Sequence, residues 1–525
     1  MVRDLCSRVR AQITHHPSFA AALTMGAALR MLAVLGYPGA LWFSDSFIYL
    51  GVALRPEPDP ARAVGYSLFL RALEPFHSLA LVTGLQHLMG LGIAVMIYAV
   101  ARRSAVPQGW ACMATLPVLL DGFEIEDEHM VMAEALFTFL VMLAMLLILR
   151  RGRVSWPTAL LAGVIAGCAV DVRTEGLPLL IVFAAFLPLR SSKGAPVRNG
   201  RHNGRGWVAA GTMVFGCAMP VLAYMGWFHA WTGEYMLTRS DGFYLWGRVS
   251  SFAECKVIRP PADELELCPP GSPSGRTPPG DYIWRAPQVR ALAGGPFSAA
   301  NDALLRDFAF RAIKAQPLGY LHSLLSGLAQ SVLWPRRPYP NAETVYFYYF
   351  HPEPQVIPAD RSWVAGGTPF QDAVQYGRTT PSQVVEPFAI LISWYEQLFF
   401  TYGPLFGLIL LTGLGGVVRI RRKPARLAWC RRRGSMLPWI TAVVLLVFPI
   451  ATADFDYRYL LPPLPFACLA AALAFAPMRV PVTHRPAGPG PDHTVTSDRV
   501  EPGNVADRLA QRAEYPGHAR INPLL

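Results

Sequence analysis

A single carboxylate in an apolar stretch near the start of the chain is the first residue that points to chemistry. The segment LWFSDSFIYL (41–50) contains Asp45 as its only charged side chain, between Phe43 and Phe47. Partial loss of water raises the pKa of a carboxyl group and makes it a stronger base. Asp45 is therefore a candidate for a general base with a raised pKa, and the alternative is an acid of an ordinary outer loop. The other acids of this region are expected to belong to an ordinary wet loop, and they are Glu57, Asp59 and Glu74.

A second group of acids precedes the apolar run ALFTFLVMLAMLLIL. In EIEDEHMVMAE (124–134), Glu128 and His129 are adjacent, and Glu134 stands directly before the apolar residues. Glu and His side chains bind divalent metals, but a solvated acidic loop would have the same composition. Glu128 and His129, together with Asp45, are therefore the candidates for a metal site. Glu134 is a candidate site residue at the membrane interface.

Two arginines stand beside apolar runs and are candidates for binding a phosphate. Arg173 lies in AGCAVDVRTEGLPLL, and Arg458 lies in DFDYRYLLPPLP, where Tyr459 follows it. A guanidinium group donates two parallel hydrogen bonds to a phosphate. The alternative is an ion pair with a neighbouring acid, and those acids are Asp171, Glu175, Asp454 and Asp456. Arg30 is a third isolated cation, which either reaches the interface or pairs with an acid on a neighbouring span.

The elements that must position these residues are membrane spans. The chain has 525 residues, of which 53% are hydrophobic and 16% charged, whereas about a quarter of the residues of a soluble protein are charged. We expect an all-α polytopic membrane protein with about 10–13 transmembrane helices, some of them short. The ten expected spans are 17–37, 79–101, 108–121, 133–149, 157–170, 176–189, 207–228, 388–418, 436–453 and 459–476.

Charge asymmetry sets the expected orientation. By the positive-inside rule, loops rich in Arg and Lys are cytoplasmic. The predicted loops that contain Arg or Lys but neither Asp nor Glu are 102–108, 150–156, 190–206 and 419–433. The N-terminal segment 1–16 and a disordered tail, 477–525, are then cytoplasmic too. These loops also explain the net charge of +12, since no basic segment is interleaved with aromatic residues as nucleic-acid binding would need.

The largest expected loop is an extracytoplasmic segment, 229–387. It separates an N-terminal membrane module, 17–228, from the C-terminal spans, 388–476. Much of the segment has no clear helix or strand periodicity. One part of it, 307–334, is apolar but charged and contains Pro317, and we expect it to form an amphipathic helix on the membrane surface.

Two of the eight cysteines, Cys255 and Cys268, stand alone in this outer segment. In an oxidising compartment they are expected to form a disulfide, which closes a short loop. The alternative is a zinc site, but no histidine lies near the two thiols in the sequence to complete it. We therefore expect the disulfide.

With these features, the sequence resembles a family of polytopic enzymes, the GT-C glycosyltransferases. The family includes protein O-mannosyltransferases and the lipid A aminoarabinose transferase. The resemblance covers about 17–228 and 388–476. The segments that carry it are FSDSFIYLGVAL (43–54), ARAVGYSLFLRAL (61–73), EHMVMAEALFTFLVMLAML (128–146), AGVIAGCAVDVRTEGLPLL (162–180) and DYRYLLPPLPFACLAAALAF (456–475). LWGRVSSFAEC (245–255) is similar to an actinomycete subset with a cysteine-bearing outer loop. Three features depart from the family pattern. Ser46 replaces a second acid, Ser67 replaces a common proline, and EIEDEH (124–129) is more acidic than the pattern.

The resemblance implies transfer of a sugar from a polyprenyl-phosphate donor to a hydroxyl of an extracytoplasmic acceptor, usually with inversion. The acceptor would be a glycan, lipid or protein of the cell envelope, and the enzyme would lie in the plasma membrane. Asp45 would be the base, and Arg173, Arg458 and Tyr459 would bind the donor phosphate. The further substrate-site candidates are Tyr49, Tyr66, Glu128, His129 and Glu134. Metal dependence varies in the superfamily, so a divalent metal stays open as a cofactor.

Two other classes of protein remain as alternatives. A transporter or lipid flippase would place ionisable residues near the bilayer midplane and repeat broken helices in two halves, whereas the acids here gather at one interface. An inactive scaffold for envelope assembly would make Asp45 dispensable. The sequence has no Walker A loop and no strand-linked GxGxxG, so an ATP-driven pump is not expected.

Overall fold

The computed structural model describes residues 15–150, 152, 154–191, 204–360, 362, 364–379, 382–418 and 425–477. Within these ranges the chain forms α-helices and short 3-10 helices. Among the described residues, β-pairing is limited to one isolated parallel bridge, between Leu41 and Met130. The expected all-α class is confirmed. The segments 1–14 and 478–525, most of the basic loop 190–206 and residues 419–424 of the basic loop 419–433 lie outside the described residues. The predictions made for the two termini lie outside them too.

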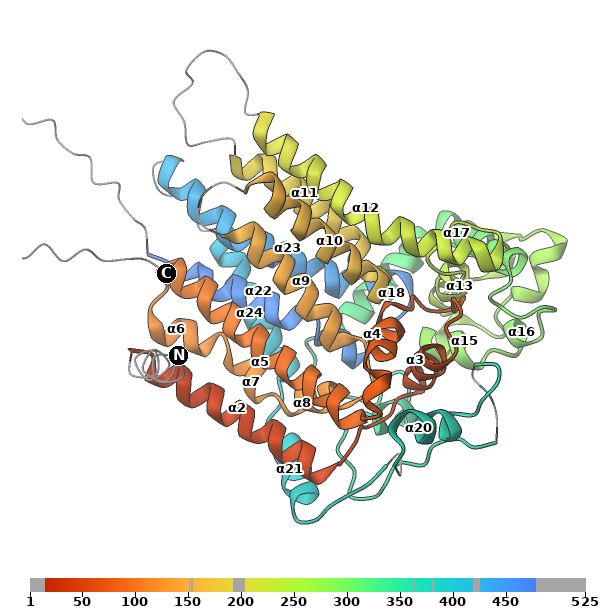
Figure 1. Ribbon diagram of the computed structural model, residues 1–525. Coiled ribbons are helices and arrows are strands. Elements are labelled where there is room, and N and C mark those ends of the chain that lie inside the picture. Colours follow the sequence, from red (N-terminus) through yellow and green to blue (C-terminus); the bar gives the residue numbers. More distant parts are fainter. Residues whose placement is uncertain are drawn as a thin grey trace, which may run out of the picture. The chain divides into compact units, whose positions relative to one another are not determined.

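Each of the ten expected spans coincides with one or two helices. These helices lie side by side (Figure 1). Their bounds are α2 Pro17–Gly36, α5 Leu79–Arg103, α6 Gln108–Met113 with α7 Leu116–Leu120, α9 Glu134–Leu149, α10 Trp156–Val172, α11 Leu177–Ser191, α12 Gly204–Thr232, α21 Phe388–Leu398 with α22 Gly403–Val418, α23 Ala425–Thr452, and α24 Pro463–Ala474.

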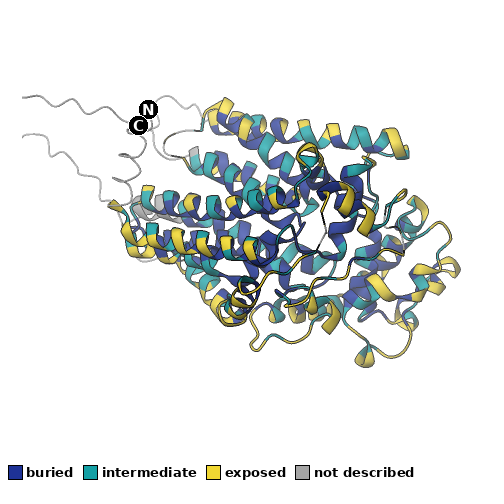
Figure 2. Cartoon of the chain, turned by 60° about the horizontal axis from the view of Figure 1, so that its bottom comes forward, coloured by how far each residue is buried: buried dark blue, intermediate teal, exposed yellow. Residues whose placement is uncertain are grey.

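Exposed residues lie along the outer faces of this helix bundle (Figure 2), and large apolar side chains are among them. They include Ile181, Trp207, Phe215, Leu222, Leu408 and Leu411. A soluble protein rarely exposes contiguous apolar surface of this kind, whereas a lipid-facing surface is expected to be apolar. The protein is therefore a multi-pass membrane protein.

The length of the helices limits how many of them cross a bilayer alone. In the described ranges, four helices are long and apolar enough to do so, and a bent pair makes a fifth. The four are Pro17–Gly36, Leu79–Arg103, Gly204–Thr232 and Gly434–Thr452. A hydrocarbon core of about 30 Å needs about 20 helical residues, and the other apolar helices are shorter. Helices therefore lie at the positions of the expected spans, whereas the crossing of the bilayer by each of them, and the number of spans, stay predictions.

The span expected at 388–418 is not one helix. It is broken into α21 and α22, which are bent by 59°. The break is held by the N-terminal end of α8 (Gly122–His129). The Gly122 N–H donates to the Phe399 carbonyl at 2.8 Å, and the Thr401 N–H donates to Asp121 at 2.7 Å. Backbone groups that leave a helix inside a membrane protein need such partners, so the contacts explain why the break is tolerated.

Two glycines allow the backbone of α10 to lie in close contact with neighbouring helices. A Cβ atom on Gly167 of α10 would lie 2.5 Å from the Cys217 carbonyl oxygen of α12, so these helices pack backbone against backbone. A Cβ on Gly65, the first residue of α4 (Gly65–Leu73), would lie 2.5 Å from the Asp171 carbonyl oxygen. The loop before α4 therefore lies against the end of α10, directly before Arg173.

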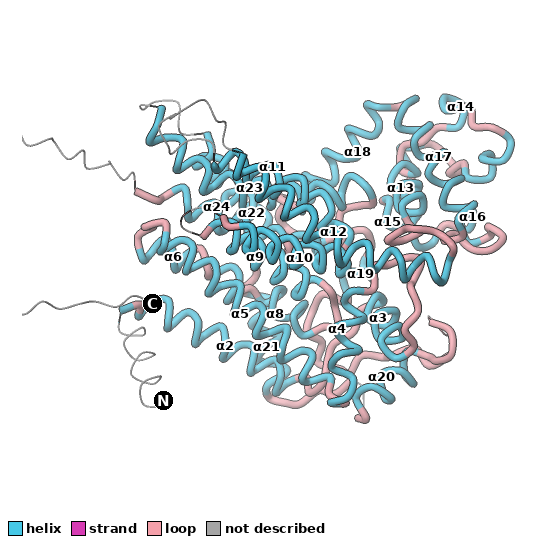
Figure 3. Tube along the Cα trace, turned by 45° about the horizontal axis from the view of Figure 1, so that its top comes forward, coloured by secondary structure: helices cyan, strands magenta, loops and turns pink. Residues whose placement is uncertain are grey.

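The outer segment is largely helical, although its sequence predicted little regular structure. Its elements gather at one end of the bundle, where α3 (Ser44–Leu54) and α4 also lie (Figures 1 and 3). They are α13 Asp241–Ser250, α14 Cys255–Ile258, η3 Ala262–Leu267, η4 Pro273–Gly275, α15 Pro279–Arg285, α16 Pro287–Arg290, α17 Ala299–Ala315, α18 Pro317–Gln330, α19 Ala342–Tyr346 and α20 Pro369–Gly377. The helix expected at 307–334 is divided between α17 and α18, since Pro317 starts a new helix.

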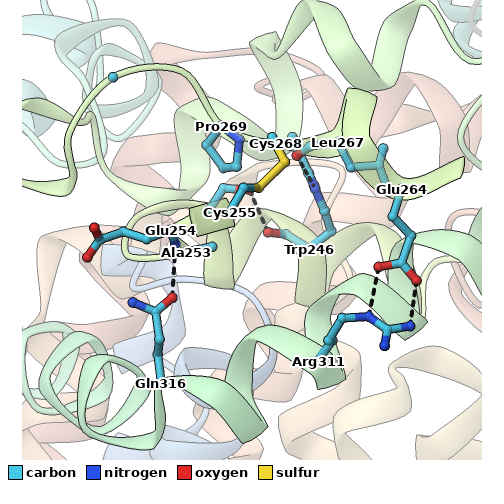
Figure 4. Close-up of a disulfide and its surroundings, with 12 residues drawn as sticks. Trp246, Ala253, Glu254, Cys255, Glu264, Leu267, Cys268, Pro269, Arg311 and Gln316 are labelled. Atoms are coloured by element: carbon cyan, nitrogen blue, oxygen red, sulfur yellow. Dashed lines mark hydrogen bonds and ion pairs between the residues drawn. A yellow bond between two sulfur atoms is a disulfide. The ribbon is translucent and has the colours of Figure 1, made fainter. Parts of the chain in front are cut away.

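The outer segment has its own apolar core. The disulfide is partly buried and packs against this core (Figure 4). Cys255 and Cys268 are bonded, with their Cα atoms 6.0 Å apart, so both thiols are consumed. Beside them, the Trp246 indole N–H donates to the Leu267 carbonyl at 3.1 Å. Arg311 forms two hydrogen bonds with Glu264, at 3.0 and 3.1 Å. The segment thus has the disulfide that the sequence predicts rather than a pair of zinc ligands.

Candidate active site

The first turn of α3 presents Asp45. The Phe43 N–H donates to Ser46 Oγ at 2.9 Å, and the Ser46 N–H donates to the Phe43 carbonyl at 3.0 Å, so Ser46 stabilises the start of the helix. A carboxylate in the first turn interacts favourably with the helix dipole. Ser46, at the position where the GT-C pattern has a second acid, therefore has a structural role and Asp45 stands alone.

Asp45 is held between two arginines from distant parts of the chain. Its Oδ1 atom is 2.6 Å from Arg62 Nη2, and its Oδ2 atom accepts a hydrogen bond from Arg458 Nη1 at 2.8 Å. Burial alone would raise the pKa of Asp45, which is 4% exposed, but the two guanidinium charges outweigh it and lower the pKa below its usual value. The expectation of a raised pKa was wrong, because it left out the arginines.

Arg458 is fixed by the short helix η6 (Tyr457–Leu460). Asp456 caps this helix by accepting the Arg458 N–H, and it also accepts Arg458 Nε at 3.2 Å. Glu134, at the start of α9, shares its Oε1 atom between Arg173, to which it is hydrogen-bonded, and Arg458 Nη1 at 3.8 Å. Three acids thus surround Arg458. Burial lowers its pKa, but neighbours that include Asp45 and Asp456 raise it above its usual value and keep the guanidinium charged.

Tyr459 lies between the two arginines that the sequence predicts. Its ring centre is 5.4 Å from the Arg458 guanidinium carbon and 5.8 Å from that of Arg173. Both are cation–π distances. Arg173 also pairs with Glu175 at 3.0 Å, so the expected phosphate ligand is also an ion-pair partner. Asp45, Glu134, Arg173, Arg458 and Tyr459 are therefore one cluster.

The cluster opens into a cavity of about 590 Å³. Asp45, Arg62, Arg458 and Tyr459 line it, whereas Arg173 and Glu134 do not and stand behind them. The aromatic side chains of the wall are Trp42, Phe43, Phe47, Tyr244, Trp284, Phe347 and Phe455. The cavity thus lies between the first outer helix, the outer segment and the turn before α24.

Arg62 is a site residue that the sequence did not single out. Its guanidinium lies over the Trp284 ring at 5.7 Å, and its Nε atom is buried without a hydrogen-bond partner among the described residues. A buried donor without an acceptor is costly, so this N–H is suited to an acceptor brought by a ligand. The signal in the sequence was weak, because Arg62 is one of many arginines and stands in the acidic first loop.

Glu128 and His129 belong to a separate network and do not line the cavity. Arg30 donates two hydrogen bonds to Glu128, at 2.6 and 2.7 Å, and His87 Nδ1 is 2.8 Å from the same carboxylate. His129 lies between His87 Nε2 at 3.0 Å and the Tyr37 carbonyl at 2.8 Å. Burial and the neighbouring His87 lower the pKa of His129 to about 3, so it is neutral. The network joins α2, α5 and α8. Of the two predictions for Arg30, the ion pair with an acid of another element is the one observed.

Tyr49 and Tyr66 fill the space between the cavity and this network. The two rings pack edge to face at 5.1 Å. The Tyr66 hydroxyl donates to Gln86 at 2.5 Å, and Gln86 donates to the Glu128 and Met130 carbonyls at 2.8 and 2.6 Å. Neither tyrosine lines the cavity, so both act as support.

The metal candidates are not brought together. In the described part of the chain, no three His, Cys, Asp or Glu side chains form a group that could hold a metal ion. Both oxygens of Asp45 face guanidinium groups, which would repel a divalent cation. The residues present at Asp45 therefore do not fit a divalent metal.

Comparison with known proteins agrees with the resemblance drawn from the sequence. Residues 73–233 match the family of dolichyl-phosphate-mannose-protein mannosyltransferases. This is a GT-C family, so the GT-C resemblance is confirmed. The match covers less than half of the chain and includes Glu134 and Arg173 but not Asp45, Arg62 or Arg458. A search of curated proteins gives no match.

Two solved structures are similar to the chain, both of the oligosaccharyltransferase of Archaeoglobus fulgidus. One is tethered through a disulfide to an acceptor peptide with the NVT sequon, at a TM-score of 0.39 and 11% identity over 88% of this chain and 49% of that one. The other is the apo form, at a TM-score of 0.36 and 12% identity over 87% and 50%. This chain spans about half the length of the archaeal enzyme.

Proposed function

We propose that this protein is an integral membrane glycosyltransferase that moves a sugar from a polyprenyl-phosphate donor to a hydroxyl group of an extracytoplasmic acceptor. The observation that carries the proposal is the Asp45 carboxylate, held between Arg62 and Arg458 on the wall of a cavity. The cavity lies between α3, the outer segment, which would face the acceptor, and the turn before the apolar helix α24, which would face the donor tail. The GT-C match in residues 73–233 supports the same reaction class.

The donor phosphate would bind at two of the arginines that line the cavity, Arg62 and Arg458. Arg62 offers an unpartnered Nε–H, and Arg458 offers a guanidinium that is now bonded to carboxylates. Hydrogen bonds between charged groups are the strong ones, so a phosphate competes with Asp45 for both arginines. Arg173 does not reach the cavity. Its role would be to position Arg458 and Tyr459 through Glu134 rather than to bind the phosphate itself.

Donor binding would also turn Asp45 into a base. Without a ligand the arginines lower its pKa and make it a weak one. A bound phosphate offsets their charge, so the pKa of Asp45 rises towards the value that its burial favours. The base is then strengthened only when a donor is in place.

In the reaction itself, Asp45 takes the proton of the acceptor hydroxyl while the oxygen of that hydroxyl attacks the anomeric carbon of the donor sugar. The new C–O bond forms on the face opposite the phosphate, the old C–O bond breaks, and polyprenyl phosphate leaves with the bonding electrons. Inversion follows. A positioned base contributes roughly 10²–10⁴-fold, and the arginines stabilise the charge of the leaving phosphate.

The acceptor would be a cell-envelope glycan, lipid or protein, and the transferred sugar a hexose or a pentose. The outer segment forms the wall of the cavity that faces Asp45 from the acceptor side, through α15 and residues 340–347. We infer a plasma-membrane location with the active site outside the cytoplasm, because the loops without acids lie at the opposite ends of the spans.

The transporter hypothesis gains one observation, the break between α21 and α22, because transporters often use broken helices around their sites. At this break, however, the freed backbone groups of Phe399 and Thr401 are bonded to Gly122 and Asp121. No cavity arginine lies there. The enzyme is therefore the better supported function.

The test is transfer by the purified chain in liposomes that contain radiolabelled polyprenyl-phosphate sugars and membrane acceptors. The expected result is labelled acceptor with wild type and very little with Asp45→Asn. Glu57→Gln is the matched control, since Glu57 is an exposed acid of the same loop. Movement of the labelled lipid across the liposome without any labelled acceptor would support the transporter instead.

A further inference from the structure

A second cation lies on the other side of η6 from the active site. The Arg336 guanidinium carbon is 4.4 Å from the Phe400 ring centre and 5.0 Å from those of Phe123 and Tyr457. No hydrogen bond or ion pair joins its guanidinium to another described residue. Arg336 is therefore a charged group within an aromatic cage, with its N–H donors available, unlike the paired arginines of the cavity.

An apolar groove of about 430 Å³ begins at the same cage. Phe400 belongs to both, because it contacts Arg336 and lines the groove. The groove lies between α6 and α7, α22 and α24, and it includes Trp110, which stacks on Phe475 at 4.1 Å. Leu405, Leu408 and Ile409 line the α22 side. All of these helices lie in the expected spans, so the groove faces the bilayer.

One carboxylate lies at the polar end of the groove, but its oxygens are already used. Asp121 accepts the N–H groups of Phe123 and Glu124 with Oδ1, and that of Thr401 with Oδ2. Arg336 thus interacts with the Asp121 carboxylate only through their opposite charges, without a hydrogen bond or an ion pair between them. A cation beside an apolar groove matches a molecule with an anionic head and a hydrocarbon chain.

We infer that Arg336 and this groove form a binding site for an anionic phospholipid, whose phosphate bonds to Arg336 and whose acyl chain lies along α22 and α24. The inference goes beyond the proposed function, because neither Arg336 nor the groove lines the catalytic cavity. Trp334 and Tyr402, whose rings are 4.4 Å apart, stand beside Phe400. Tryptophan and tyrosine are enriched at membrane interfaces, where lipid phosphates lie.

The test uses the full chain in phosphatidylcholine vesicles with a trace of phosphatidylglycerol that has a nitroxide label on its acyl chain. Electron paramagnetic resonance measures the fraction of label that the protein immobilises. Arg336→Gln should weaken the relative affinity about tenfold, since a hydrogen bond to a charged group is lost. Leu408→Trp, which fills the groove at a lipid-facing position, should lower the immobilised fraction as well.

Arg337→Gln is the matched control, because Arg337 is exposed and contacts Tyr457 only through its backbone. It should bind the labelled lipid as wild type does. Equal immobilisation by the Arg336→Gln and Arg337→Gln variants would overturn the proposal. So would displacement of the label by polyprenyl phosphate at concentrations at which unlabelled phosphatidylglycerol has no effect, since the site would then belong to the donor.

Discussion

Two buried ion networks in this molecule look alike in the sequence and differ in what surrounds them. One is Asp45 with Arg62 and Arg458, and the other is Arg30 with Glu128 and His87. In each, an acid beside an apolar run is bonded to arginine from another part of the chain. The first lines a cavity and keeps a buried N–H without a partner. The second is sealed between helices, and its arginine is fully bonded.

The difference teaches how to separate a catalytic acid from a structural one. A sealed network loses stability when one partner is removed, because the other is left as a buried, unpaired charge. A network on a cavity wall can exchange partners with a ligand, and water reaches the remaining charge when one partner is removed. Loss of activity and loss of stability should therefore fall on different residues.

The largest expected effect is on the cavity side. Arg458→Gln removes the cation that holds Asp45 and that would stabilise the leaving phosphate, so turnover should fall by about 10²–10³-fold, as when an oxyanion donor is lost. Steady-state transfer of radiolabelled sugar is the measurement. Arg337→Gln, an exposed arginine, is the control. A fall of less than threefold for Arg458→Gln would remove this residue from the mechanism.

The next effect belongs to the sealed network. Glu128→Gln leaves Arg30, which is 2% exposed, without its carboxylate, and breaking a buried pair costs about 3–5 kcal/mol. The melting temperature in detergent should fall, while transfer per folded molecule stays within about twofold of wild type. The Arg30→Met, Glu128→Leu double variant should recover part of the loss, because it removes both charges. A Glu128→Gln variant that keeps the wild-type melting temperature but transfers no sugar would contradict a structural role and make Glu128 a catalytic residue.

A smaller effect is expected from Arg62. Arg62→Gln removes one of two proposed phosphate ligands and should raise KM for the donor about tenfold, with a smaller change in kcat. This rise in KM should appear with donors of any sugar, since the contact is to the phosphate. Unchanged KM with a lowered kcat would assign Arg62 to the transition state alone.

The smallest effect concerns pH. The arginines hold the pKa of Asp45 below its usual value, so the carboxylate stays ionised to lower pH, and the acid limb of kcat/KM should lie lower than for an ordinary Asp. Arg62→Gln removes one lowering charge and should shift that limb to higher pH. In wild type the acid limb of kcat should lie above that of kcat/KM, because the donor phosphate offsets the arginines. Limbs at the same pH would contradict the proposed exchange of partners.

Much of the membrane architecture could be predicted from the sequence, because apolar runs between basic loops define where helices lie. The cluster of Asp45, Arg173 and Arg458 could be predicted too, since each stands at the end of such a run on the same side. The break within 388–418 could not be predicted, because Phe399 and Thr401 leave the helix for partners near Asp121. Hydropathy does not record such long-range hydrogen bonds.

The separation of Glu128 and His129 from the active site could not be predicted either. Both stand near Glu134 in the sequence, but on α8 they point towards α2 and α5 rather than to the cavity. Arg62 and much of the aromatic wall come from the expected outer segments, in which the sequence shows no clear periodicity. The pKa of Asp45 was mispredicted for the same reason, since its sign depends on which charges the fold brings to it.

The most direct measurement compares donor binding and transfer in the Asp45→Asn variant. Affinity for polyprenyl phosphate is measured with the purified chain, and a single turnover follows the labelled sugar to the acceptor. Because Asn no longer competes for Arg62 and Arg458, the variant should bind the phosphate at least as tightly as wild type and transfer sugar about 10²–10⁴-fold more slowly. Transfer at the wild-type rate, or a loss of transfer explained wholly by weaker binding, would contradict a catalytic Asp45.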